Sequence, residues 1–176
     1  MAPDASWLKE HIRDIPDFPE PGVVFRDITP LLQDVDAFRF SVDAMTDHFS
    51  GVAIDHVLGV EARGFICAAP VAYRFGASFV PVRKAGKLPA EIEREEYELE
   101  YGTDLLEVHR DAISPEDKCV IVDDVLATGG TASATTRLAE RLGGDVVGLA
   151  FLVELCFLGG RDKLGDHDVL SLVTYE

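Results

Sequence analysis

The stretch from Val120 to Thr131, VIVDDVLATGGT, constrains the fold of this chain more than any other segment. Its apolar run is typical of a central parallel strand buried on both faces, and the run ends in Asp123 and Asp124. The pair Gly129-Gly130 then turns the chain toward a helix that we expect over about residues 131–142. Ligands of open parallel sheets bind at the edge where the strands end. The stretch therefore predicts an α/β domain with two carboxylates at a ligand-binding edge.

The glycine turn has the composition of an anion cradle. Two glycines let the backbone approach a ligand closely, and N–H groups at a helix N-terminus bind phosphate. Thr128 and Thr131 add hydroxyl donors, and the turn lacks the lysine of a P-loop, which argues against a nucleoside triphosphate site. A single-phosphate cradle beside two carboxylates suits a sugar phosphate, whose vicinal hydroxyls need acceptors. The alternative is a solvated acid pair before an ordinary glycine turn.

Strand-like and helix-like segments alternate along the rest of the chain. Apolar runs typical of buried strands span residues 56–61, 78–83, 118–124, 146–155 and 168–175. Helices are expected over residues 36–49 and 64–76, and a half-exposed hairpin over residues 96–110. This order predicts an α/β fold with a mainly parallel, twisted sheet flanked by helices.

A proline-rich segment lies near the start of the chain. Residues 15–30 contain four prolines and one glycine, which exclude long regular structure. The segment also carries Phe18 and Phe25, and it is too apolar for a solvated linker. A rigid apolar loop of this length is typical of a lid or a binding wall. We expect one domain over residues 1–176, with residues 1–32 as an N-terminal hood and residues 33–176 as the core.

The chain is strongly acidic, with 32 Asp and Glu against 16 Lys and Arg and a net charge of −16. Such a surface argues against nucleic acid and anionic membranes as partners. A high-salt habitat and an ordinary acidic cytosolic enzyme both account for the excess of acid. The three cysteines are widely spaced in apolar runs, which indicates reduced thiols and a cytoplasmic protein. No apolar run reaches the roughly 18 residues of a membrane span.

The stretch at 120–131 resembles the motif with which type I phosphoribosyltransferases bind 5-phosphoribosyl 1-pyrophosphate (PRPP). The resemblance implies that Asp123 and Asp124 hold the ribose hydroxyls. It also implies a 5′-phosphate site made of Ala127, Thr128, Gly129, Gly130 and Thr131.

Further segments resemble the adenine phosphoribosyltransferases in the same order, over essentially the whole chain. They are residues 17–32, 59–65, 82–89, 97–102 and 152–155. The resemblance implies transfer of the phosphoribosyl group of PRPP to N9 of adenine, which gives AMP and pyrophosphate in purine salvage. Two alternatives stay open: a 6-oxopurine phosphoribosyltransferase, and a PRPP-sensing regulator. The regulator usually adds a DNA-binding domain, for which this chain has neither room nor a basic face.

The resemblance also implies an adenine site. Phe25 would stack on the purine, and the backbone at Val24 and Arg26 would read the edge of the base. Val125 and Leu126 would form the opposite wall. Core packing of Phe25 is the alternative that the residues alone leave open.

Four basic side chains are implied at a pyrophosphate site, and part of this set could serve the neighbouring subunit of a homodimer. They are Arg63, Arg83, Lys84 and Lys87. A solvated basic patch is the alternative.

The resemblance implies that Glu100 is the acid–base residue, which would take the N9 proton of adenine. Tyr101, the next residue, is a candidate for a contact with the substrate. The 85–104 loop would close to exclude water. Mg²⁺ is the implied cofactor; it would be held mainly by substrate oxygens and waters, with no direct protein ligand.

Overall fold

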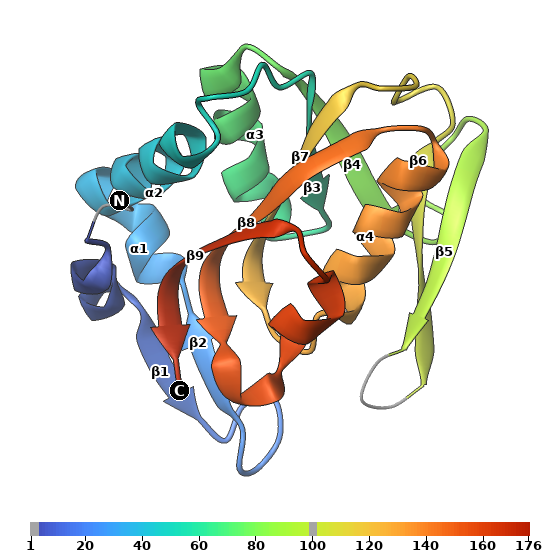
Figure 1. Ribbon diagram of the computed structural model, residues 1–176. Coiled ribbons are helices and arrows are strands. Elements are labelled where there is room, and N and C mark those ends of the chain that lie inside the picture. Colours follow the sequence, from blue (N-terminus) through green and yellow to red (C-terminus); the bar gives the residue numbers. More distant parts are fainter. Residues whose placement is uncertain (1–3, 99–101) are drawn as a thin grey trace.

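A seven-stranded sheet forms the centre of the molecule (Figure 1), in a computed structural model that describes residues 4–98 and 102–176. The strands are β3 (His56–Val60), β4 (Ser78–Lys84), β5 (Ile92–Glu98), β6 (Thr103–His109), β7 (Lys118–Leu126), β8 (Asp145–Leu155) and β9 (Asp168–Tyr175). They lie in the order β5-β6-β4-β3-β7-β8-β9. The five strands from β4 to β9 in this order pair in parallel, and β6 is antiparallel to both β4 and β5. The predicted mainly parallel sheet is confirmed, and its parallel strands end at one edge.

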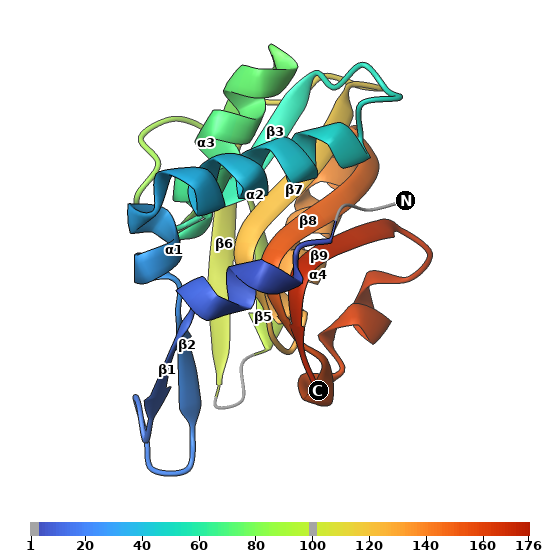
Figure 2. The ribbon, with the colours of Figure 1, turned by 90° about the vertical axis from the view of Figure 1, so that its left-hand side faces the viewer.

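Helices cover both faces of the sheet (Figure 2). One face carries α1 (Thr29–Gln33), α2 (Val35–His48), α3 (Gly64–Phe75) and the 3-10 helix η1 (Ser6–His11), whereas α4 (Gly130–Arg141) covers the other. Two short 3-10 helices, η2 (Cys156–Leu158) and η3 (Gly160–Leu164), connect β8 to β9. Within the described ranges, every helix is too short or too polar to cross a membrane.

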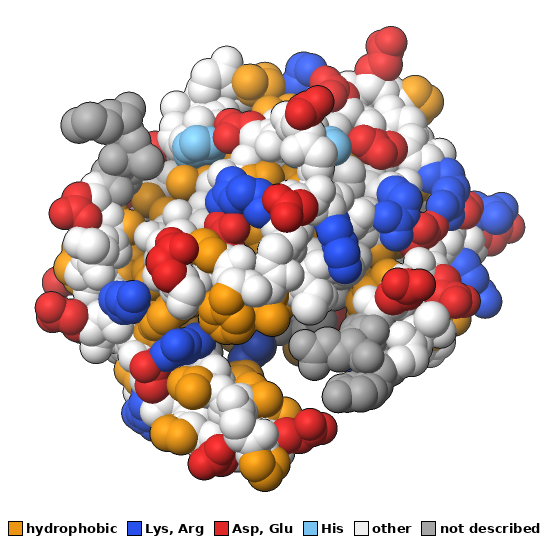
Figure 3. Space-filling model, turned by 60° about the horizontal axis from the view of Figure 1, so that its bottom comes forward, with side chains coloured by type: hydrophobic (Ala, Val, Ile, Leu, Met, Phe, Trp, Pro, Cys, Tyr) orange, Lys and Arg blue, Asp and Glu red, His pale blue; other side chains and the backbone are white. Residues whose placement is uncertain are grey.

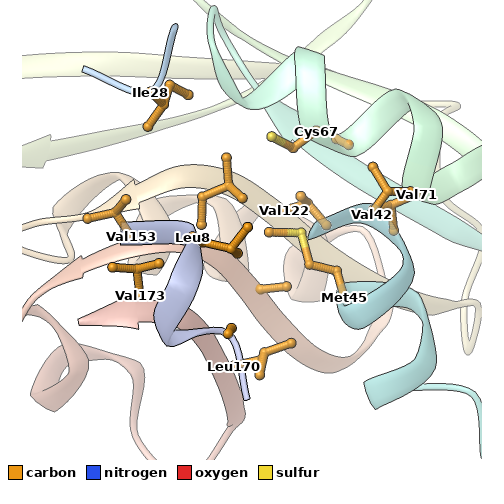
Figure 4. Close-up of a cluster of buried hydrophobic side chains, with 14 of the residues drawn as sticks. Leu8, Ile28, Val42, Met45, Cys67, Val71, Val122, Val153, Leu170 and Val173 are labelled. Atoms are coloured by element: carbon orange, nitrogen blue, oxygen red, sulfur yellow. The ribbon is translucent and has the colours of Figure 1, made fainter. Parts of the chain in front are cut away.

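The core is divided by the sheet into two apolar clusters. Along β7, Val120 and Val122 point into the cluster under α2 and α3, which Figure 4 shows, while Cys119 and Ile121 point toward α4. This alternation follows from the two-residue period of a strand. Each fully buried side chain of this size stabilises the fold by roughly 1.5–3 kcal/mol, so the apolar run that marks β7 in the sequence also anchors the site at its end.

Two helices on this face of the sheet have identifiable ends. The side chain of Asp34 accepts hydrogen bonds from the N–H groups of Asp36 and Ala37, at 3.1 and 2.8 Å, and so begins α2. Gly76 ends α3 in the left-handed conformation, at φ +68°. The helix α3 continues through Pro70, because the packing of its buried face outweighs the hydrogen bond that proline removes.

The proline-rich segment forms a separate two-stranded antiparallel sheet, β1 (Arg13–Pro16) with β2 (Val24–Asp27), which pairs Ile15 with Phe25. Three of its four prolines lie in the connecting turn or at the end of β1, and Pro30 lies in the first turn of α1; a missing N–H is tolerated at all of these positions. The flanking segments are not peripheral, since Leu8, Ile28 and Leu31 are fully buried in the same cluster as Val122. Residues before position 33 thus contribute both an exposed hairpin and part of the core.

The three cysteines are free in the structure; Cys67 and Cys119 are buried, whereas Cys156 is partly exposed. Burial raises the pKa of the Cys119 thiol to about 12. Since the thiolate is the reactive form, this residue packs as a small apolar side chain.

Candidate functional site

A cavity of about 510 Å³ opens at the carboxyl ends of the parallel strands. The molecule is hollowed on this side, next to a lobe on which hydrophobic side chains gather (Figure 3). The lining residues are Val60, Glu61, Ala62, Arg63, Lys84, Lys87, Tyr97, Leu106, Asp123, Asp124 and Thr131. Six of the residues predicted from the sequence therefore meet in one cavity, although they come from three separate segments of the chain.

The two acids at the end of β7 differ in environment. Asp124 is 6% exposed, and its Oδ2 atom accepts no hydrogen bond from any described residue. Asp123 Oδ1 accepts the N–H of Asp124 at 2.9 Å. Burial, followed by the neighbouring charge of Asp124, raises the pKa of Asp123. Two close carboxylates resist ionising together, and hydroxyl donors that bound to the pair would favour its ionised form.

Close packing between α3 and β7 brings the guanidinium of Arg63, in the loop after β3, next to this acid pair. A Cβ atom on Gly64 would lie 2.5 Å from Asp123 Oδ1, so any other residue where α3 begins would have to displace this carboxylate. The preceding residue, Arg63, places its Nε atom 2.7 Å from Asp124 Oδ2. A short loop after β3 thus delivers a guanidinium to the acids after β7.

The turn after β7 has the geometry of an anion site. Gly129 has φ +76° and precedes the first turn of α4, which no side chain caps within the described part of the chain. The N–H groups of this turn are therefore available to an anion, and the positive end of the helix dipole favours one. Thr131 lines the cavity directly, whereas Gly130 does not line it and packs beside Tyr97, which does. The glycine turn therefore leads into an uncapped helix N-terminus, and its role as a phosphate cradle stays a prediction.

Glu61, at the end of β3, joins the basic residues into one cluster, and sequence reasoning missed it. Its carboxylate accepts Arg83 Nε at 3.2 Å and the N–H of Lys84 at 3.1 Å, and it forms an ion pair with Lys87. Burial alone would raise its pKa, but these hydrogen bonds outweigh burial and lower the pKa to about 2. The missed signal was its position, because Glu61 directly follows a buried strand, and Asp123 and Asp124 lie near the end of another.

Three of the four predicted pyrophosphate residues line the cavity, and the fourth does not. Lys84, Lys87 and Arg63 line the cavity, and Lys84 Nζ lies 3.3 Å from Asp104. Arg83 does not line it; its guanidinium contacts Glu61 from outside.

The predicted adenine residues lie on the hairpin and at the end of β7. The Arg63 guanidinium is 5.0 Å from the ring centroid of Phe25, so the hairpin meets the cavity at this cation. The side chain of Arg26 instead forms an ion pair with Asp14 and covers Tyr175 at 3.9 Å.

Val24 is exposed on the hairpin. Leu126 is only 1% exposed and packs with the cluster beneath α4, so the structure does not bring its side chain to the cavity. The neighbouring Val125 is partly buried on the other side.

Glu100 and Tyr101 lie outside the described residues. The closest described neighbour with a place in the cavity is Tyr97, on β5, whose hydroxyl donates to Asp104 at 3.3 Å. Sequence reasoning did not single out Tyr97. Across residues 4–98 and 102–176, no three His, Cys, Asp or Glu side chains gather as a metal cage.

The fold and the cavity define a phosphoribosyl transferase domain, whose family model matches residues 40–169. An adenine phosphoribosyltransferase of Thermobifida fusca is 57% identical over 175 residues, which are 99% of each chain. The crystal structure of adenine phosphoribosyltransferase from Thermoanaerobacter pseudethanolicus has a TM-score of 0.92 and 53% identity over 96% of this chain and 98% of that one. That of the Saccharomyces cerevisiae enzyme, complexed with an imino-altritol bisphosphate and adenine, has a TM-score of 0.92 and 41% identity over 98% and 99%. The chain belongs to the adenine phosphoribosyltransferases.

Proposed function

We propose that this chain transfers the 5-phosphoribosyl group of PRPP to N9 of adenine, forming AMP and pyrophosphate in purine salvage. The observation that carries the proposal is the single cavity in which paired acids, a helix N-terminus and three cations meet. A sugar phosphate that also bears a pyrophosphate presents matching groups. Its hydroxyls fit the acids, its 5′-phosphate fits the glycine turn, and its pyrophosphate fits the cations.

The ribose and its 5′-phosphate would bind at the end of β7. Asp123 and Asp124 would accept the ribose hydroxyls, and the unbonded Asp124 Oδ2 is an acceptor for one of them. Residues 127–131 would hold the 5′-phosphate through backbone N–H groups and threonine hydroxyls.

The pyrophosphate would bind among Arg63, Lys84 and Lys87, and these cations would stabilise charge as the C1′–oxygen bond breaks. Arg83 would act on this set through Glu61. Arg63 and Lys87 are paired with the carboxylates of Asp124 and Glu61, so these cations are held near the position that the leaving group would take.

Adenine would lie between the hairpin and the end of β7, with its ring on Phe25 and its edge read by the backbone at Val24 and Arg26. The new bond forms between N9 and C1′, and the N9 proton would pass to Glu100. Leu126 would contribute through its backbone, because its side chain is buried.

Mg²⁺ fits this site as a cofactor, since the carboxylates are hard oxygen donors and Asp124 Oδ2 has a free lone pair. The ion would be held mainly by oxygens of PRPP and water, near Asp123 and Asp124. When bound, it would supply positive charge to the pyrophosphate oxygens.

We also propose a homodimer in the cytoplasm, with residues 1–32 as a hood on a single domain. The exposed face of α2 supports an interface, because Val35 is 69% exposed beside the apolar groove that Phe38 and Pro70 line. The charge of −16 argues against nucleic acid and membranes as partners. Sedimentation velocity at micromolar concentration tests the dimer.

The activity is tested by incubating the protein with adenine, PRPP and Mg²⁺ and measuring AMP by chromatography. Equal mixtures of adenine, guanine, hypoxanthine and xanthine then test the 6-oxopurine alternative, and we expect AMP to dominate the products. PRPP binding without AMP formation would instead support the regulator.

A further inference from the structure

We propose that Gly160, together with the ion pair between Glu154 and Arg161, positions the phosphate loop (residues 127–130) and so sets the affinity of the 5′-phosphate subsite. The inference rests on the proposed function, which places the 5′-phosphate on this loop. None of the three residues lines the cavity. They are therefore positioning residues that act through the loop.

The turn at Gly160 packs against the phosphate loop, backbone on backbone. A Cβ atom on Gly160 would lie under 3.0 Å from Ala127 O and 2.8 Å from Gly129 N, and one on Gly129 would lie under 3.0 Å from Gly160 O. Backbone atoms cannot rotate away as the end of a flexible side chain can. Neither glycine can therefore carry a side chain unless the two segments move apart.

The adjacent Arg161 fastens this turn to the sheet. Its Nε atom donates to Glu154 Oε1 at 2.9 Å while Nη2 donates to Oε2, which makes a bidentate pair. Its Nη1 atom also donates to Val169 O at 2.9 Å, and Nη2 donates to Ser171 Oγ at 3.2 Å. One guanidinium thus ties the turn to both β8 and β9.

The anchor of this arrangement lies directly beside the phosphate loop. Glu154 is 5% exposed, and in the pairing of β7 with β8 it stands opposite Leu126, the last residue before the loop. The connection runs from Glu154 through Arg161 and Gly160 to Gly129, just before α4 begins. The loop is thereby held at both sides, by its own strand and by a turn some thirty residues later in the chain.

This placement predicts a specific effect on phosphate. The backbone N–H groups of a phosphate site bind tightly only when they already point at the anion. Loss of the packing contact with Gly160 would misalign these N–H groups. It would leave unchanged the proposed adenine site on the β1–β2 hairpin. We therefore expect weaker binding of PRPP and of the phosphate of AMP, with adenosine binding and kcat at saturating PRPP within about twofold of the parent protein.

The test compares Gly160→Ala with Gly51→Ala. Gly51 has no heavy atom within 4 Å of an added Cβ, and neither position requires a positive φ, so the pair isolates the steric contact. Calorimetry gives the dissociation constants of AMP and adenosine for each protein. We expect the adenosine-to-AMP ratio of these constants to fall at least tenfold in Gly160→Ala and to stay unchanged in Gly51→Ala.

A ratio within twofold of the parent value in Gly160→Ala would overturn the inference. A parent protein that binds AMP no better than adenosine would contradict the phosphate site of the proposed function itself, and the inference with it. The two failures are thus distinguishable from the same titrations.

The ion pair is tested by Arg161→Lys and Arg161→Met. Lysine keeps the charge beside Glu154 but cannot make the two-pronged contact, so the ratio should fall several-fold in Arg161→Lys and further in Arg161→Met. If Arg161→Met fails to fold, Arg161→Lys alone decides. A general loss of stability would weaken adenosine binding as well, so equal losses for both ligands would overturn the positioning role.

Discussion

The Nε atom of Arg63 lies 2.7 Å from Oδ2 of Asp124, a buried oxygen that still accepts no hydrogen bond from the described residues. The Arg63 guanidinium balances the charge of this carboxylate but donates no hydrogen bond to Oδ2. A hydroxyl donor entering the cavity would therefore gain a charge-assisted hydrogen bond without displacing an existing one.

Asp123→Asn combined with Asp124→Asn should raise KM for PRPP at least tenfold, with KM for adenine within about twofold. The amides lose the charge that favours hydroxyl donors and Arg63. Steady-state kinetics with each substrate varied in turn would measure both values. Asp145→Asn, at an exposed ion pair with Lys118, is the matched control. Unaltered kinetics in the double variant would count against the ribose assignment.

Phe25→Ala should raise KM for adenine about tenfold, since base–aromatic stacking contributes about 1–3 kcal/mol. KM for PRPP should hardly change. The comparison variant is Val52→Ala, a truncation of an exposed side chain in the loop before β3, at the opposite edge of the sheet. Core packing, the rival role for Phe25, predicts a lower Tm and equal losses for both substrates.

Glu61 should make stability depend on pH in a defined window. Its pKa is about 2 in the folded protein, against an ordinary value of 4.5. Its ionised form therefore stabilises the fold fully above pH 4.5, and this contribution is lost as the pH falls toward 2. We expect Glu61→Gln to lower the free energy of unfolding by about 1–2 kcal/mol at pH 7.

Urea titrations at pH 7, 5, 4 and 3 would measure this difference. The gap between Glu61→Gln and the parent should narrow below pH 4.5, whereas the exposed Glu10→Gln should track the parent throughout. A gap that stays constant with pH would contradict the ion-pair explanation.

Glu100→Gln should lower kcat at least tenfold while leaving KM for PRPP unchanged, because the amide cannot take the N9 proton of adenine. Glu98→Gln removes an exposed acid two residues earlier and serves as the control. If kcat of Glu100→Gln stays within about twofold, acid–base work by this residue is wrong.

Much of the fold was predictable from periodicity. The buried strands were found because parallel strands are apolar on both faces, and α2 was found from its helical spacing. The start of β5 was missed: we expected it at residue 96, whereas the strand begins at Ile92. Glu95 on this strand pairs with Arg137 and Arg141 of α4. A strand that packs through ion pairs to a distant helix leaves no apolar pattern to detect.

The site was predictable where its residues follow one another along the chain. The acids and the glycine turn could be assigned because strand, turn and helix N-terminus are consecutive. Glu61, Tyr97 and Gly160 could not, since their importance arises only from contacts with residues far away in the sequence. The burial of Leu126 also depends on how α4 packs over β7.

The cavity is lined by three acidic and three basic side chains, and two of the bases, Arg63 and Lys87, are each paired with an acid of the cavity. A chloride or other simple anion would have to separate a cation from its carboxylate. Such an anion has no hydrogen-bond donor that could bind the freed carboxylate. A ligand that carries both anionic groups and hydroxyl donors would bind the cation and the carboxylate at the same time. We expect these charge pairs to favour such a ligand over the common anions of a cell.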